Sequence, residues 1–152
     1  MDYLNKIKNY CAKREVCKSE AIKKLLAYGI NKEETQKIVE ILVKQKHIDE
    51  KRYASAYIND HYKLKKWGRN KIKNCLKLKG IKSQDINLSL KEINQTIYLN
   101  NLQEILSQKF KNIQKTEKYS IKEKKGKLYN HLISRGYEPS LILKEITLIK
   151  NI

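Results

Sequence analysis

The feature that most restricts the fold of this 152-residue chain is a pattern that recurs around three glycines. Each glycine has a leucine four residues before it, an apolar residue directly after it and an aliphatic residue ten positions after it. Glycine readily adopts the left-handed conformation that ends a helix, so each pattern predicts two helices joined by a short turn. The matching residues are Gly29, Gly80 and Gly136; Leu25, Leu76 and Leu132; Ile30, Ile81 and Tyr137; and Val39, Leu90 and Ile146.

The segments on both sides of the glycines have apolar residues at helical spacing, and none shows a sustained alternation typical of strands. Ile38, Ile41 and Leu42, for example, predict the inner face of one helix. Residues 95–112 predict a longer helix, and the polar residues 111–119 predict a loop after it. Side chains that accept backbone hydrogen bonds mark the helix starts, where we expect N-caps at Ser19, Asn31, Asp49, Ser83 and Ser120 and a first-turn proline at Pro139.

Another helical segment precedes each glycine pattern, so the repeating unit is three helices of about 50 residues. The predicted fold is all-α, with three tandem three-helix repeats and about nine helices. Because one such unit is too small to bury much core alone, we expect neighbouring repeats to share apolar surface in an elongated, curved assembly. The low content of Gly (five) and Pro (one) disfavours a β-sandwich or barrel. The expected boundaries are 1–47, 48–94 and 95–152.

The chain has a formal net charge of +18, and the charge is concentrated in the middle and C-terminal thirds. Nine basic residues and no acidic one lie between Asp60 and Asp85. The mutual repulsion of so many like charges favours a polyanionic partner, because contacts with phosphates release condensed counterions. The alternative is a solvated lysine-rich face in a chain with a general lysine bias.

Aromatic and basic residues interleave between Arg52 and Trp67. We expect Tyr53 and Tyr57 to pack in the core with solvated hydroxyls, while Trp67 fits either the core or a surface anchor. A sequence-reading helix-turn-helix is disfavoured. A recognition helix needs Arg, Asn or Gln at its start, and the helices after the glycines begin NKEE, KSQD and EPS.

The sequence contains no recognisable catalytic or metal-binding pattern. The acidic pairs Glu33–Glu34 and Asp49–Glu50 are explained by helix N-termini. The three cysteines and three histidines lack the spacing of a zinc site, and they are Cys11, Cys17, Cys75, His47, His61 and His131. We therefore expect neither an enzyme nor a metal or cofactor. No apolar run approaches a membrane span and the N-terminus lacks a signal-peptide core, so we expect a cytoplasmic protein that does not bind membranes.

Two short motifs in their order and spacing resemble RecX regulatory proteins. Members of that family carry R-E-x-S-x-x-E-L-x-x-K-L-x-x-x-G followed by D-x-R-F-A-x-x-Y. The first corresponds here to Arg14, Glu15, Lys18, Glu20, Lys24, Leu25 and Gly29, with Cys17 in the serine position. The second corresponds to Asp49, Arg52, Tyr53, Ala54 and Tyr57, with Tyr53 in place of the usual Phe. Residues 94–125 diverge from the sequences of that family.

The resemblance implies three tandem three-helix repeats and a regulator that lies in the groove of the RecA–DNA filament. It implies limits on filament growth, ATP hydrolysis, strand exchange and the coprotease step of the SOS response. We expect a monomer that contacts RecA and single- or double-stranded DNA, directly or through RecA. The alternative is a non-specific DNA-binding, nucleoid-type protein. The candidate binding residues are Lys18, Arg52, Lys65, Lys66, Trp67, Arg69, Lys73, Lys125 and Arg135.

Overall fold

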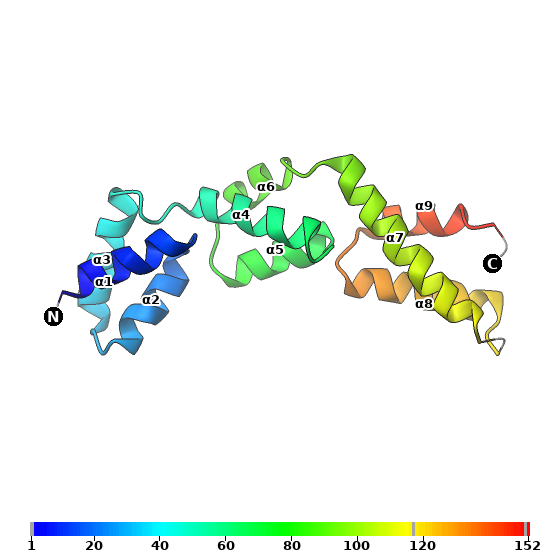
Figure 1. Ribbon diagram of the computed structural model, residues 1–152, viewed down its shortest axis with the longest axis horizontal. Coiled ribbons are helices and arrows are strands. Elements are labelled where there is room, and N and C mark those ends of the chain that lie inside the picture. The colour runs from blue at the N-terminus through cyan, green and yellow to red at the C-terminus, as the bar shows by residue number, and fades with distance from the viewer. Residues whose placement is uncertain (1, 117, 151) are drawn as a thin grey trace. The chain divides into compact units, whose positions relative to one another are not determined.

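The computed structural model describes residues 2–116, 118–150 and 152, and this part of the chain forms nine helices and no strand. The prediction of an all-α fold is therefore confirmed, and Figure 1 shows the helices in chain order. They are α1 (Tyr3–Lys13), α2 (Lys18–Ala27), α3 (Lys32–Lys44), α4 (Glu50–Lys63), α5 (Arg69–Leu78), α6 (Ser83–Leu90), α7 (Gln95–Gln114), α8 (Ile121–Ser134) and α9 (Pro139–Thr147).

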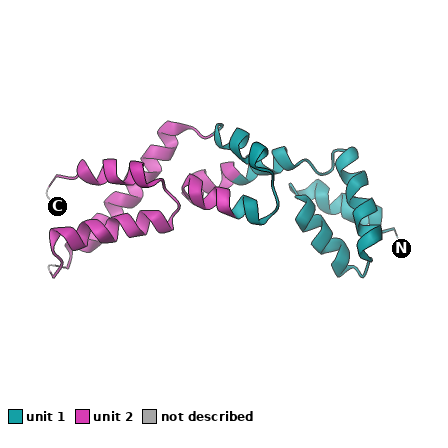
Figure 2. Ribbon diagram, turned by 180° about the vertical axis from the view of Figure 1, so that it is seen from behind, with its two compact units in different colours: residues 1–57, 75–92 teal, residues 58–74, 93–152 magenta. Residues whose placement is uncertain are grey.

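The chain divides into two compact units, which are described separately. Unit 1 comprises residues 1–57 and 75–92, and unit 2 comprises residues 58–74 and 93–152 (Figure 2). Unit 1 therefore contains α1, α2, α3 and α6, together with the first part of α4 and the last part of α5. Unit 2 contains the remaining parts of α4 and α5 together with α7, α8 and α9. The three-repeat boundaries stay a prediction.

The three pattern glycines end α2, α5 and α8 in the same way. Gly29, Gly80 and Gly136 all have positive φ, of 87°, 83° and 95°. In each case the amide of the residue after the glycine donates to the carbonyl of the leucine that lies four residues before the glycine. This is the Schellman arrangement. The three bonds run from Ile30 to Leu25 (3.3 Å), from Ile81 to Leu76 (3.1 Å) and from Tyr137 to Leu132 (3.1 Å).

A fourth turn of this kind ends α3 without a glycine. Lys46 has a φ of 62°, and the amide of His47 donates to the carbonyl of Leu42 at 2.9 Å. A left-handed lysine costs about 1 kcal/mol relative to glycine. The sequence pattern did not predict this turn, because a lysine carries no left-handed signal.

The helix starts agree with the sequence in part. Side chains of Asn31, Asp49 and Ser120 accept the expected backbone hydrogen bonds, which confirms these three caps. The expected cap at Ser19 is wrong, since α2 begins two residues earlier than that cap implies and Cys17 is its N-cap, with Glu20 accepting from the Cys17 amide at 3.2 Å. Ser83 is also not a cap.

The expected cap at Ser83 lies one position after the observed N-cap. Lys82 is the N-cap of α6 and offers no side-chain acceptor. The loop expected from residue 111 begins later, because α7 continues to Gln114. Pro139 stands in the first turn of α9, as predicted.

The core of unit 1 is built mainly from α1, α2 and α3. Its largest fully buried side chains include Ile7, Leu25 and Leu42. Tyr53 is buried and Tyr57 half-buried, which confirms their expected place in the core. Ile41 is 38% exposed, so the prediction that it faces inward is wrong, and Val39 is buried instead.

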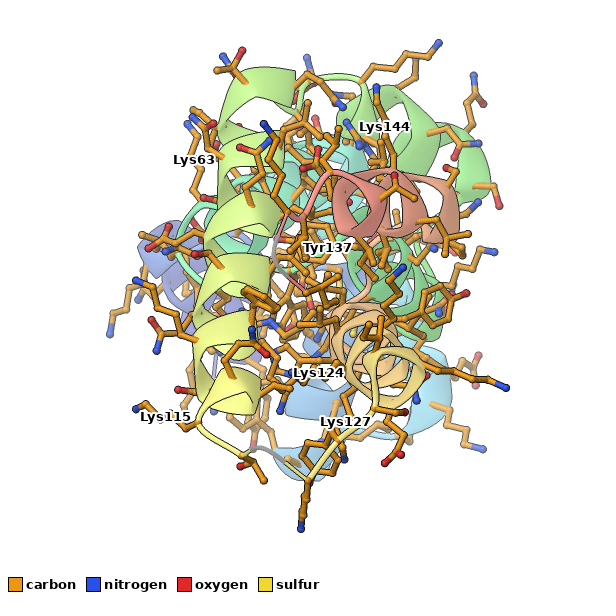
Figure 3. The ribbon with its side chains drawn as sticks, turned by 90° about the vertical axis from the view of Figure 1, so that its right-hand side faces the viewer. Lys63, Lys115, Lys124, Lys127, Tyr137 and Lys144 are labelled. Atoms are coloured by element: carbon orange, nitrogen blue, oxygen red, sulfur yellow. The ribbon has the colours of Figure 1, made fainter. Side chains whose placement is uncertain are left out.

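The core of unit 2 contains two tyrosines among aliphatic side chains. Tyr98 of α7 and Tyr137, just before α9, are almost completely buried, and their ring centroids lie 5.2 Å apart. Figure 3 shows Tyr137 between α7, α8 and α9. Buried tyrosine hydroxyls need hydrogen-bond partners, and those partners organise the residues considered next.

Candidate functional site

The nine candidate binding residues are divided between the two units. Lys18 and Arg52 belong to unit 1, and the other seven belong to unit 2. In unit 2, five of them gather where the start of α5 meets the turn between α8 and α9. These five are Lys65, Lys66, Trp67, Arg69 and Arg135.

Arg52 is held by an ion pair within unit 1. Its Nε lies 2.6 Å and 2.7 Å from the two carboxylate oxygens of Glu15, and its guanidinium also donates to the Lys46 carbonyl at 3.2 Å. The hydrogen bond to Glu15 raises the pKa of Arg52. Because both side chains are substantially exposed, such a pair contributes under about 1 kcal/mol.

Arg69 lies at the centre of a partly buried polar cluster that we call the Arg69 junction, formed by Arg69, Gln95, Tyr98 and Glu138. Its guanidinium lies 3.0 Å from Glu138, 2.6 Å from Gln95 and 4.1 Å above the Tyr98 ring. The Tyr98 hydroxyl accepts from the Arg69 amide at 2.9 Å and donates to Glu138. Burial, followed by the bond to Glu138, raises the pKa of Tyr98. The Arg69 junction therefore ties α5 to α7 and α9 within unit 2.

Arg135 is also engaged with the backbone of unit 2. Its guanidinium donates to the carbonyl of Lys65 at 2.7 Å, and the Tyr137 hydroxyl donates to the carbonyl of Lys66 at 2.7 Å. Lys66 itself has a φ of 56°. The side chains of Arg135 and Tyr137 thus stabilise the left-handed turn between α4 and α5. Their first role is therefore in the fold of unit 2.

Trp67 is half-buried against charged neighbours. Its ring lies 4.6 Å from that of His61, and the ammonium groups of Lys71 and Lys65 lie 4.2 Å and 5.4 Å from its centroid. Trp67 therefore occupies neither of the two predicted positions, because it is not fully buried in the core and its ring is not free on the surface. It packs as a platform between cations.

The other three candidates lie outside the Arg69 junction. Lys18 begins α2, and its amide lies 3.4 Å from a carboxylate oxygen of Glu50, whose pKa is raised by burial. Lys73 is half-buried on α5, and Lys125 is exposed on α8.

A groove between α7 and α8 in unit 2 brings together residues that the sequence did not single out. The groove has a volume of about 390 Å³, and Lys109 and His131 line it beside Lys66 and Arg135. Burial, followed by the charges of Lys109 and Arg135, lowers the pKa of His131. The side chains that line the groove include three cations, Lys66, Lys109 and Arg135, and one carboxylate, Glu104.

Sequence reasoning also missed the hydrogen-bond acceptors of the two arginines, Glu15, Gln95 and Glu138, because each lies 26 to 69 positions from its arginine. One signal was present. Gly68 precedes Arg69, and a glycine permits two backbone segments to approach closely. Among the described residues, no group of three or more His, Cys, Asp or Glu side chains could hold a metal ion, and no helix is long and apolar enough to cross a membrane.

Comparison with known proteins shows similarity to one family. The family model described as "RecX, second three-helix domain" matches residues 49–90. The "Regulatory protein RecX" of Clostridium acetobutylicum is 36% identical over 128 residues, which are 81% of this chain and 58% of that protein. The one of Clostridium tetani is 34% identical over 86% of this chain and 56% of that protein. The chain therefore spans less than two thirds of the length of these relatives.

Solved structures show the same fold. A "Crystal structure of regulatory protein RecX" superposes with a TM-score of 0.85 at 19% identity, covering 95% of this chain and 70% of that one. The "Crystal structure of RecX from Lactobacillus salivarius" gives 0.81 at 20% identity, covering 95% and 92%. Over the stretch that it shares with these relatives, the chain belongs to the RecX family.

Proposed function

We propose that the chain binds the RecA–DNA filament and inhibits the recombinase, ATPase and coprotease activities of RecA, without chemistry of its own. The observation that supports this most is the similarity of 81% of the chain to a protein named regulatory protein RecX, the family for which the sequence resemblance implies RecA modulation. The net charge of +18 also supports a polyanionic target, because a filament of protein and DNA presents many phosphates.

The inhibition would follow from binding alone. A helical protein that bridges neighbouring RecA protomers blocks the rearrangement that ATP turnover or strand exchange requires, if it binds that arrangement more tightly than the others. We expect it to act as a monomer and to dock faster at low salt. Ion pairs already occupy Arg52, Lys66 and Arg69. Contacts to the filament therefore fall first on the ammonium groups of Lys65, Lys73 and Lys125 and on Trp67.

The decisive measurement is DNA-dependent ATP hydrolysis by RecA on single-stranded DNA. We expect inhibition when the chain is substoichiometric to RecA, because one molecule that blocks growth affects many protomers. A lack of inhibition at every ratio would overturn the proposal.

The alternative function is non-specific DNA binding, which the excess of basic over acidic residues in unit 2 (17 against 6) favours. In that case inhibition begins only when the chain is in excess over DNA binding sites, because it then competes with RecA for DNA. Titrating DNA at a fixed ratio of chain to RecA separates the two functions, since added DNA relieves competition and does not relieve filament blocking.

A charge-matched pair of variants tests the contact residues. Lys65→Gln with Lys73→Gln and Lys125→Gln should raise the concentration for half-inhibition about tenfold. The control removes three exposed lysines of α3 in unit 1, namely Lys32, Lys37 and Lys44. Equal loss in both variants would mean that only net charge matters.

A further inference from the structure

A cavity in unit 1 has a lining that is partly apolar and partly cationic. Its volume is about 490 Å³, which lies within the range of binding sites for small ligands and short peptide segments. Tyr10 comes from α1, Lys23 and Ala27 come from one face of α2, and Leu78 ends α5. All four belong to unit 1, which is teal in Figure 2. We call this cavity the α2 groove.

Hydrogen bonds fix the end of α5 against the start of α2, so the α2 groove is preformed. The Ser19 hydroxyl donates to the Lys79 carbonyl at 2.8 Å, and the Lys79 ammonium lies 3.5 Å from one carboxylate oxygen of Glu20. The other oxygen of Glu20 accepts from the Cys17 amide at 3.2 Å. Both oxygens of the carboxylate that lines the groove are therefore engaged within unit 1.

The positive charge of the α2 groove exceeds its negative charge. Three lysines, Lys23, Lys24 and Lys79, line it beside one carboxylate, Glu20. Glu20 pairs with Lys79, and among the described residues neither Lys23 nor Lys24 has a carboxylate within ion-pair distance. A ligand with two or more negative charges therefore complements the groove.

The apolar part of the α2 groove is open to solvent. Leu78 is 88% exposed, more than any other large apolar side chain in the described part of the chain. A single exposed leucine is common on protein surfaces. Leu78 differs because it lines a cavity together with Tyr10 and Ala27, beside two uncompensated lysines. A ligand that removes this apolar surface from water gains binding energy in addition to the ionic contacts.

The combination of the two parts favours a peptide over a phosphate chain. A phosphodiester backbone complements Lys23 and Lys24 but has no apolar side chain for Leu78. A nucleic-acid base needs an aromatic face on which to stack, and the cations of Lys24 and Arg14 already lie 5.1 Å and 4.8 Å from the centroid of the Tyr10 ring. An acidic peptide carries carboxylates and aliphatic side chains on neighbouring residues, so it matches both parts.

We propose that the α2 groove docks an acidic peptide segment of a protein partner. An aliphatic side chain of the segment packs against Leu78 and Tyr10. Carboxylates that flank this side chain pair with Lys23 and Lys24. The inference goes beyond the proposed inhibition of RecA, because the docking requires neither DNA nor a filament and uses none of the unit 2 residues to which we assign the filament contacts.

Fluorescence anisotropy with a labelled synthetic peptide tests the proposal in the absence of RecA and DNA. The probe places Leu and Phe between pairs of Asp and Glu residues, and a control peptide carries Ser in place of Leu and Phe. Leu78→Ser should raise the Kd of the probe about tenfold, which corresponds to the burial of about half a leucine side chain. Leu64→Ser is the matched control and should leave the Kd unchanged, since Leu64 is 79% exposed but belongs to unit 2.

A second pair of variants tests the ionic part of the α2 groove. Lys23→Gln with Lys24→Gln should raise the Kd of the probe about fivefold at low salt and less at high salt, because salt screens exposed ion pairs. The control is Lys32→Gln with Lys37→Gln, which removes the same charge from exposed positions of α3 in the same unit. It should change the Kd much less.

Three outcomes would overturn the inference. The first is no saturable binding of the probe up to about 1 mM, or equal binding of the Ser control peptide. The second is an equal effect of Leu78→Ser and Leu64→Ser, or of the two lysine pairs, which would indicate net charge without a site. The third is that Leu78→Ser weakens the binding of labelled single-stranded DNA as much as that of the probe, which would indicate nucleic acid as the occupant.

An NMR titration of the unmodified chain covers a variant that fails to fold. The probe should shift the methyl resonances of Leu78 in a carbon–proton correlation spectrum and leave those of Leu64 in place. Leu78 methyl resonances that do not move at saturation would contradict the proposal. Absence of RecA inhibition with peptide binding in the α2 groove would overturn the proposed function alone, and the reverse result would overturn this inference alone.

Discussion

Gly68 and Gly136 of unit 2 lie backbone against backbone. The Gly68 amide donates to the carbonyl of Arg135 at 2.8 Å, and the Asn70 amide donates to the carbonyl of Gly136 at 2.9 Å. A Cβ placed on Gly68 would lie 2.2 Å from the carbonyl carbon of Gly136 and 2.3 Å from the nitrogen of Tyr137. Neither backbone segment can move away without breaking the hydrogen bonds that join them.

The first prediction is that Gly68→Ala destabilises the protein by about 3 kcal/mol or more, because the methyl group forces the start of α5 away from the turn before α9. Urea unfolding monitored by circular dichroism measures the change. Gly126→Ala is the matched control, since Gly126 lies inside α8 and a Cβ there meets nothing within 4 Å. It should stabilise the protein by about 1 kcal/mol. Similar effects of the two substitutions would contradict the close approach.

The second prediction concerns the Arg69 junction. Tyr98→Phe removes the acceptor of the Arg69 amide and the donor to Glu138 and should cost about 1–3 kcal/mol. Tyr10→Phe is the control, because the Tyr10 hydroxyl accepts from Arg14 at an exposed position and its loss should cost under about 0.5 kcal/mol. Unfolding free energies from urea titration decide the question. Equal costs would mean that the junction adds nothing beyond a surface contact.

The glycine pattern was enough to predict the helix pairs, because the conformation it requires is local. A residue with positive φ at the end of a helix, a leucine four positions before it and an apolar residue after it form one hydrogen-bonded turn, and all of them lie within six residues. The same argument explains the confirmed caps at Asn31 and Ser120. Where a different side chain could take the same role, as Cys17 does in place of Ser19, the local signal was ambiguous by about two residues.

The polar contacts could not be predicted in this way, because they depend on distant parts of the chain. Arg69 and Glu138 are 69 positions apart, and a lysine- and arginine-rich sequence offers many equivalent cations for each acid. The sequence therefore indicated that the surface is basic without showing which cations are committed to the fold. The structure shows that Arg69 and Arg135 are committed, and it brings Lys109 and His131 into the α7/α8 groove.

The third prediction concerns alkaline pH. Burial raises the pKa values of Tyr53, Tyr98 and Tyr137 above the ordinary value of 10.0. The stability contributed by their neutral forms is fully present below pH 10 and is lost as the pH rises above it, because the unfolded state then releases protons that the folded state keeps. The urea midpoint should therefore fall between about pH 9 and pH 11. Tyr53→Phe should reduce the steepness of this fall, and a midpoint independent of pH would contradict the assignment.

The fourth prediction concerns His131. Its pKa should lie below the ordinary value of 6.5, because burial and the charges of Lys109 and Arg135 disfavour the imidazolium. The unfolded chain then binds a proton more readily, so the stability contributed by neutral His131 is present above pH 6.5 and is lost as the pH falls below it.

A proton NMR titration of the His131 Cε1–H resonance, assigned with His131→Gln, measures this pKa. Lys109→Gln should raise it towards 6.5, since one of the two repelling charges is removed. Lys127→Gln serves as the control, because the cations that lower the pKa are Lys109 and Arg135. Added salt should also raise the pKa by screening both charges. A pKa at or above 6.5, or one that Lys109→Gln leaves unchanged, would contradict the assignment of burial, Lys109 and Arg135 as the causes that disfavour the imidazolium.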